Sequence, residues 1–434
     1  MKRIDISAHR LINALLARSG AGGVSILDSC GVGHLGSHLL IAGTDPVEVF
    51  QISNNDPQKS LSEFQALLER GLAAVFTISY DFGRKLESSS SGIRNGSAEP
   101  DIYVCLYDAL VVHDYDSDET FLTGNAEGFD GDLVGDLVGE TARDEFDDIE
   151  GIAPYESTFT FDEYIDAVET IKECIRRGDT YQTNLTMQLS VDLGERMTPQ
   201  RVFQRLRRDH PAPFAAFIDR GDSYVVSASP ERFLHISKDK ISTSPIKGTR
   251  PQGADAVENI RLQKELLDSE KDRAENTMIV DLLRNDLGRV CEFGGVEVTK
   301  LCDLEVHPTL CHLVSTIEGK LKDEVKFVDV LQALFPCGSI TGAPKVRTMQ
   351  IIDELEPNAR GLSMGAIGYF IPDTGFDRLE PGFDLSVAIR TMVIRDGIAT
   401  FNVGGGITID SDPHSEYDES FLKAKALLAA LGNK

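Results

Sequence analysis

Apolar residues along this chain follow helical and strand-like spacings in separate groups rather than in steady alternation. Helical spacing dominates four stretches of the C-terminal part: 161–179, 198–211, 258–290 and about 413–431. Runs of β-branched and aromatic residues lie between them, as in TYQTNLTMQLSVDL and LSVAIRTMVI. Because strands cluster with strands and helices with helices, the pattern predicts an α+β fold rather than a Rossmann or barrel fold.

Two of these helical stretches carry signals for where a helix starts or stops. The 258–290 pattern is interrupted near Asp268–Ser269, which predicts a break there. The last helix has Asp412 as its N-cap, Pro413 at its first position and Gly432 beyond its end.

The composition changes near residue 150. Residues 116–150 are rich in Asp, Glu and Gly, include the small duplication GDLVGDLVGE, and predict a solvated connector. A serine run, Ser88–Ser91, predicts a surface loop between two strand-like runs. The sequence therefore predicts an N-terminal region over 1–150 and a second region over 151–434, packed together as one unit.

Composition and charge exclude several classes of function. The chain has 43 Lys and Arg against 70 Asp and Glu, a formal net charge of −27, which argues against a nucleic-acid partner. No run approaches the roughly 18 to 20 apolar residues that span a bilayer, and the N-terminus lacks the features of a secretory signal. Seven scattered cysteines, never spaced as CxxC, predict free thiols. We therefore expect a cytoplasmic protein with no nucleic-acid or membrane partner.

Acidic residues gather on one face of each of two predicted helices. Asp272 and Glu275 are three residues apart, and their face continues into apolar positions, so we expect both to point inward. Glu416, Glu419 and Lys423 share a face of the last helix. Carboxylates that converge in a cavity repel one another unless a divalent cation bridges them, and Mg²⁺ prefers oxygen ligands. On spacing alone, the alternative is an exposed Glu419–Lys423 pair that stabilises by about 0.3 kcal/mol.

Three further features are candidates for chemistry. The glycine run Gly404–Gly406 and the segment GSITGAP (338–344) each precede a helix, and as turns they would offer backbone N–H groups to a carboxylate or phosphate; plain turns are the alternative. Lys247, in SPIKGTRP, is either a solvated loop charge or, if desolvated, a nucleophile. His312 is either a half-buried structural histidine or a general acid.

Taken together, the motifs resemble those of the chorismate-utilising enzymes. The resemblance covers about residues 156–430 in order, and SILDS (25–29) and SYDFGRKLE (79–87) resemble the N-terminal region of anthranilate and aminodeoxychorismate synthase large subunits. It implies the α+β chorismate-binding fold, with two large packed antiparallel-rich β-sheets and helices outside. The segments that carry it are TYQTNLT, SPERFL, PIKGTRPQG, KDRAENTMIVDLLRNDLGRV, HLVSTIEG, GSITGAPKVRTMQIIDELEP, GAIGYF, VAIRTMVI and GGGITIDSDPHSEYDESFLKAK.

Two positions sort the reactions within that family. Isochorismate and salicylate synthases carry a lysine where this chain has Gln182, whose amide cannot deprotonate water. Anthranilate synthases usually read PIAGT where this chain reads PIKGT, and the lysine is typical of aminodeoxychorismate synthase component I. The resemblance therefore implies amination of chorismate at C4 through a covalent Lys247 adduct, for p-aminobenzoate and folate biosynthesis. Ammonia would come from glutamine through a separate amidotransferase subunit.

The resemblance also implies a role for each matched residue. It assigns Mg²⁺ to Asp272, Glu275, Glu416 and Glu419, substrate binding to Thr341, Arg390, Gly404, Gly405, Gly406, Lys423 and Gln182, and catalysis to Lys247, His312 and Glu275. In this scheme His312 lies beside the ring and acts on the departing hydroxyl.

Departures from the family pattern leave some questions open. Gln252 and Ser363 replace an Arg and a Tyr of many relatives. SILDS differs from the tryptophan-binding LLES element, so Leu27, Asp28 and Ser29 form either a tryptophan site or a vestigial one. Two other functions remain in competition: anthranilate synthase component I, which also releases pyruvate, and a non-catalytic tryptophan-binding subunit.

Overall fold

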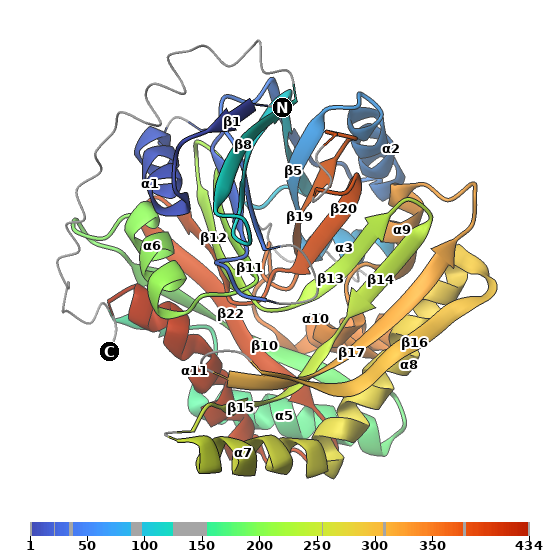
Figure 1. Ribbon diagram of the computed structural model, residues 1–434. Helices are drawn as coiled ribbons and strands as arrows, with labels where there is room; N and C mark the ends of the chain where they lie inside the picture. The colour runs from blue at the N-terminus through green and yellow to red at the C-terminus, as the bar shows by residue number, and fades with distance from the viewer. Residues whose placement is uncertain are drawn as a thin grey trace.

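The computed structural model describes residues 2–20, 22–33, 38–87, 98–124, 154–253, 255–306, 310–375 and 379–432. The Ser88–Ser91 loop, most of the predicted acidic connector and the boundary near residue 150 lie outside these ranges. The described residues form four layers, with helices outside two packed β-sheets (Figure 1). The predicted α+β fold with two large antiparallel sheets is confirmed. Among the helices of the described part, none is long and apolar enough to cross a membrane.

The larger sheet has 12 strands, and every pair in it is antiparallel. The N-terminal strands form one half of this sheet and the later strands form the other half, and the two halves are joined where β2 pairs with β11. In spatial order, with β9 paired to β10, its members are β1 (Lys2–Ile4), β8 (Glu119–Gly124), β7 (Ala109–Asp114), β3 (Leu39–Gly43), β2 (Ser25–Asp28), β11 (Phe214–Asp219), β12 (Tyr224–Ser229), β21 (Thr391–Arg395), β22 (Ile398–Ile407), β10 (Gln182–Asp192), β18 (Gly342–Ala343) and β9 (Tyr155–Ser157).

The smaller sheet has 10 strands and is also antiparallel. In spatial order, with β16 paired to β17, its members are β15 (Ile246–Pro251), β17 (Leu310–Leu321), β14 (Lys240–Ser244), β13 (Arg232–Ser237), β20 (Gly382–Val387), β19 (Ala366–Ile371), β5 (Ala73–Ile78), β6 (Ile102–Tyr107), β4 (Glu48–Ile52) and β16 (Cys291–Val306).

Three large apolar cores hold the layers of the described part together. Ile41, Val75 and Ile218 belong to the core between the sheets, to which strands of both contribute. The outer face of the larger sheet packs against α1 (Ala8–Arg18), α5 (Phe161–Arg176), α6 (Pro199–Asp209) and α11 (Pro413–Ala430). The outer face of the smaller sheet packs against α2 (Pro57–Leu68), α8 (Glu270–Val290) and α9 (Phe327–Leu334). The remaining helices are α3 (Tyr80–Leu86), α7 (Ala256–Asp268), α10 (Lys345–Leu355) and the 3₁₀ turn η1 (Gly338–Ile340).

The predicted helix signals at two positions are confirmed. Helices α7 and α8 are separated at Ser269, whose hydroxyl caps α8 by accepting from the N–H of Asp272. Helix α11 begins at Pro413, and the Asp412 side chain accepts from the N–H of Ser415.

The prediction that Gly404–Gly406 forms a turn before the last helix is wrong. These glycines lie inside β22 and pair with Thr186, Leu185 and Asn184 of β10. Their backbone groups therefore belong to a strand ladder, and the run does not offer the N–H groups of a helix start. The absence of side chains here lets the backbones of β22 and β10 approach closely, because a Cβ atom on Gly404 would lie 1.9 Å from the carbonyl oxygen of Leu185.

A buried ion pair fixes the start of β10 to the turn before α10. The side chains of Arg360 and Glu356 are 1% and 4% exposed, with Nη2 and Oε1 2.7 Å apart. Arg360 also donates to the backbone carbonyls of Asn184, at 2.7 Å, and Ile340, at 3.1 Å. The N–H of Asn184 donates to the carbonyl of Thr341 at 2.8 Å. One guanidinium thus positions both backbone segments that carry predicted site residues.

Replacing Arg360 with Met should lower the free energy of unfolding by about 3 to 5 kcal/mol, because Glu356 would remain as a buried charge without its cation. Urea denaturation followed by circular dichroism measures the change. Arg176→Met, which removes an exposed ion pair with Glu173, is the matched control and should cost less than about 1 kcal/mol. Equal shifts for the two variants would contradict the role assigned to Arg360.

Candidate functional site

Lys247 lies on β15, where the smaller sheet packs against α8. Gly248 follows it at φ +69°, and a Cβ atom there would lie 3.0 Å from the Asp272 side chain. Glycine therefore allows the strand to approach the helix this closely. Lys247 is half-buried. Its positive charge acts to lower the pKa of three carboxyl groups, those of Glu231, Glu275 and Glu419.

On α8, Asp272 and Glu275 point inward, as predicted. Their side chains are 18% and 16% exposed. Asp272 Oδ2 lies 3.3 Å from Nη2 of Arg250. Burial raises the pKa of the Glu275 carboxyl, and the nearby ammonium groups of Lys247 and Lys271 offset part of this rise. Glu275 is therefore a desolvated carboxyl group with cations beside it.

Helix α11 supplies the second set of carboxylates. Glu416 is buried and accepts a hydrogen bond from the Ser411 hydroxyl at 2.7 Å. Glu419 is half-exposed and pairs with Lys423 at 2.9 Å. Desolvation raises the pKa of Glu419, but the adjacent lysines outweigh it, so the pKa lies below its ordinary value. A Cβ atom on Gly405 would lie 3.2 Å from both Glu416 Oε2 and Lys423 Nζ, so these side chains rest on the glycine strand.

The carboxylate cluster fits a hard divalent cation by its chemistry. Oxygen donors from α8 and α11 are the ligand type that Mg²⁺ takes. Within the described ranges, however, no three His, Cys, Asp or Glu side chains are grouped closely enough to hold a metal ion. The ammonium group of Lys271 instead lies 3.9 Å from Glu275 Oε1 and 3.8 Å from Glu416 Oε1.

Arg390 and His312 share an open cavity of about 650 Å³. The cavity is also lined by Pro213 and by Leu427 of α11. Burial lowers the pKa of the Arg390 guanidinium. His312 is buried, and its Nδ1 lies 2.8 Å from the hydroxyl of Thr249, two residues from Lys247 on the same strand. The cavity thus lies beside the Lys247 cluster.

Gln182 and Thr341 are both fully buried at the start of β10 and the end of η1. Neither amide atom of Gln182 has a hydrogen-bond partner in the part of the chain described, and a Cβ atom on Gly406 would lie 2.1 Å from its Nε2. The Thr341 hydroxyl donates to the carbonyl of Cys337 at 3.0 Å. Thr341 could donate to a substrate carboxylate only by breaking this bond.

Glu231 is a further member of the cluster, and the sequence alone predicts no role for it. It is buried between β12 and β13, and its Oε1 has no hydrogen-bond partner among the described residues. Burial raises the pKa of Glu231 to about 7, against the lowering effects of Ser339 and Lys247. Its signal in the sequence is a lone acidic residue in SPERFL, between two strand-like runs.

The departure at Ser363 has a structural explanation. Its hydroxyl accepts from the N–H of Asn402 at 3.1 Å, so it contacts the backbone of β22 from a buried position.

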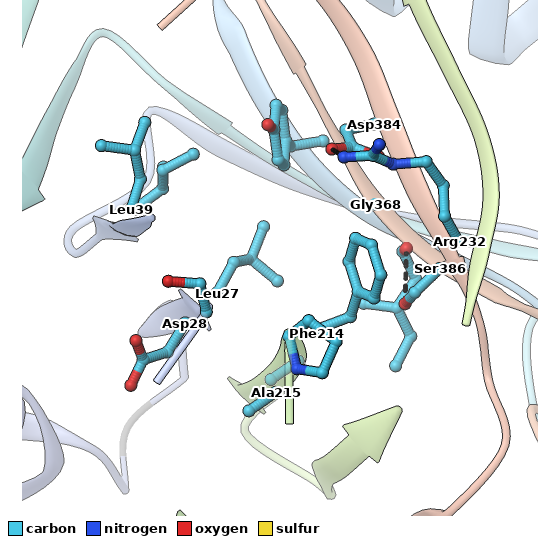
Figure 2. Close-up of a pocket in the computed structure, with 15 residues that line it drawn as sticks. Leu27, Asp28, Leu39, Phe214, Ala215, Arg232, Gly368, Asp384 and Ser386 are labelled. Carbon is cyan, nitrogen blue, oxygen red and sulfur yellow. Dashed lines mark hydrogen bonds and ion pairs between the residues drawn. The ribbon is translucent and has the colours of Figure 1, made fainter. Parts of the chain in front are cut away.

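A second cavity, of about 570 Å³, lies between the sheets (Figure 2) and includes the predicted Leu27, Asp28 and Ser29. The Asp28 carboxylate forms an ion pair with Arg207, with Arg207 Nε and Asp28 Oδ2 2.6 Å apart. The Ser29 hydroxyl is buried without a partner among the described residues. The cavity is lined elsewhere by Phe214, by the Arg232–Asp384 ion pair and by Pro213, which also lines the first cavity.

All seven cysteines lie among the described residues, and each is a free thiol.

Comparison with known proteins places most of the chain in one family. Residues 28–429 match the family described as chorismate binding enzyme. The chain is 34% identical over 410 residues to aminodeoxychorismate synthase component 1 of Bacillus subtilis (strain 168), covering 91% of this chain and 84% of that protein. It is 38% identical over 381 residues to anthranilate synthase component 1 1 of Haloarcula marismortui, covering 82% and 75%. Its fold is similar to the crystal structure of anthranilate synthase component I from Streptococcus pneumoniae TIGR4, with a TM-score of 0.79, 28% identity, and coverage of 91% and 93%.

The raised pKa of Glu231 predicts a pH dependence of stability. Between its ordinary value of 4.5 and about 7, the folded protein holds a proton that the unfolded chain has released, so stability falls as the pH rises through this window. Across this pH window the free energy of unfolding of wild type should fall by up to about 3 kcal/mol relative to that of Glu231→Gln. Denaturation curves from pH 4.5 to 8 measure the difference. Glu292→Gln, which removes an exposed ion pair, is the control, and its stability should depend on pH as that of wild type does. If the stabilities of wild type and Glu231→Gln changed in parallel with pH, the shifted pKa would be refuted.

Proposed function

Because the chain belongs to the family of chorismate binding enzymes, we propose that it aminates chorismate at C4 with ammonia, forming 4-amino-4-deoxychorismate. The observation that carries the proposal is the half-buried amine of Lys247 among Glu231, Glu275 and Glu419. A lysine held in this way is suited to act as a nucleophile once it has lost its proton.

Two displacements account for the reaction. Lys247 gives a proton to the Glu231 carboxylate, and its neutral amine attacks C2 of the ring. The double bond shifts and the C4–O bond breaks, while Glu231 protonates the leaving oxygen so that water departs. Ammonia then bonds to C4, the double bond shifts back, and Lys247 leaves C2 as a neutral amine. Glu231 suits this role because a pKa of about 7 allows it both to accept and to release the proton near neutral pH.

Cations of the site would bind the two carboxylates of chorismate. The half-buried guanidinium of Arg390 and the ammonium of Lys423 are suited to the enolpyruvyl carboxylate. Asp272, Glu275, Glu416 and Glu419 would hold Mg²⁺, which supplies a Lewis acid for the ring carboxylate. His312, in the cavity with Arg390, would orient the departing hydroxyl.

A partner subunit would supply the ammonia. The Bacillus subtilis relative is named component 1 of its synthase, which supports a separate amidotransferase that supplies ammonia from glutamine. The buried amide of Gln182 cannot act as a base toward water, which favours an amine as the incoming nucleophile.

Anthranilate synthase is the second candidate, and the Haloarcula relative and the Streptococcus structure favour it. That reaction adds ammonia at C2, the carbon that Lys247 would occupy. The presence of lysine at this position therefore favours the C4 product.

Lys247→Ala should lower the rate of 4-amino product formation at least about 100-fold, because no covalent adduct can form. The assay incubates full-length protein with chorismate, Mg²⁺ and an ammonium salt and separates products by chromatography. Lys240→Ala, on an exposed end of β14, is the control and should retain activity. Anthranilate from wild type, with no 4-amino product, would reject the proposal. A variant that still forms the 4-amino product at the wild-type rate would reject the covalent route.

We propose that the cavity between the sheets binds tryptophan, with the Ser29 hydroxyl as one polar contact. The chain contains no tryptophan, so the fluorescence anisotropy of added tryptophan reports binding without background. Anisotropy should rise for wild type and stay low for Ala216→Phe, which fills the cavity from the face of β11 that lies between the sheets. If wild type gives no rise at millimolar ligand, the site is vestigial.

A further inference from the structure

Lys271 stands between two carboxylates that come from different helices. It lies in the first turn of α8, with Nζ 3.9 Å from Glu275 Oε1 and 3.8 Å from Glu416 Oε1 on α11. Its side chain is 53% exposed, whereas those of Glu275 and Glu416 are 16% and 6% exposed. A solvent-exposed ammonium thus reaches two desolvated acids.

An ordinary helical ion pair does not explain this arrangement. Lys271 precedes Glu275 by four residues, which is the weaker of the two orders for such a pair. The contact with Glu416 is between helices and involves a carboxylate that is almost fully buried. A buried carboxylate needs a cation or hydrogen-bond donors to offset lost hydration, and Ser411 supplies only one donor.

The charges of the cluster are nearly balanced before any ligand arrives. Lys247, Lys271 and Lys423 act on the carboxyl groups of Glu275 and Glu419, and Arg250 pairs with Asp272. A divalent cation that enters this space must therefore replace a positive charge already there. Lys423 is held by Glu419 and by the carbonyl of Gly404, and Lys247 lies on a strand. The Lys271 side chain is 53% exposed, and its contacts among the described residues are with the two carboxylates.

We propose that Lys271 is a displaceable counterion, which neutralises Glu275 and Glu416 in the absence of a divalent cation and competes with Mg²⁺ for them. The inference rests on the proposed assignment of these carboxylates to Mg²⁺. The ammonium preserves the site when it holds no metal, and it weakens metal binding by the free energy needed to displace it.

The test is calorimetric titration of the full chain with MgCl₂, without substrate, for wild type and Lys271→Met. The variant should bind Mg²⁺ about three- to tenfold more tightly, the scale of one or two half-exposed ion pairs. With a chelator present its melting temperature should lie below that of wild type, and saturating Mg²⁺ should close this gap. Lys264→Met is the matched control, because Lys264 is an exposed lysine on α7 that makes no ion pair with the described residues. Lys271→Arg keeps the charge and should bind Mg²⁺ no more tightly than wild type.

The outcomes separate this inference from the proposed function. Equal Mg²⁺ affinity for wild type and Lys271→Met, or weaker binding by the variant, would overturn the counterion role and leave the metal site intact. Binding to the variant alone would support the role in its strongest form. Absence of Mg²⁺ binding to both proteins would overturn the metal assignment together with the inference. If Lys271→Met does not fold, Lys271→Gln replaces it in the same titration.

Discussion

Charge has to be neutralised locally where α8, α11 and β15 meet, because carboxylates removed from water are stable only when cations or hydrogen-bond donors replace the solvent. Glu275 and Glu416 are largely shielded, and the lysines around them come from three different elements. The pairing of opposite charges therefore constrains how these elements can be arranged. The same balance leaves the site sensitive to each ion that enters it, whether metal or dianionic substrate.

The close packing of these elements depends on two positions without side chains. Gly248 lets β15 lie against Asp272, and Gly405 lets Glu416 and Lys423 rest on β22. A methyl group at Gly248 would come within 3.0 Å of Asp272, which would force the strand from the helix and move Lys247 with it. The two sheets provide the rigid support against which such small distances can be kept, since their shared core consists of tightly packed apolar residues.

Features with local causes could be predicted from the sequence. The break at Ser269, the cap at Asp412 and the inward face of Asp272 and Glu275 follow from spacing and capping within one helix. The turn predicted at Gly404–Gly406 is wrong because the partners of these glycines on β10 are more than two hundred residues away in the chain. Glu231 had no predicted role for a related reason: its burial and its proximity to Lys247 exist only after the strands assemble. The ion pair between Asp28 and Arg207 likewise joins segments that are distant in the sequence, so it could not be predicted from local spacing.

Pro213 belongs to the walls of both cavities, one beside Arg390 and the other between the sheets. The two cavities are therefore neighbours that share part of one wall. Proline fixes its own φ angle, so the backbone at this shared wall has less conformational freedom than another residue would allow. A ligand that displaced Pro213 in one cavity would therefore change the shape of the other cavity directly.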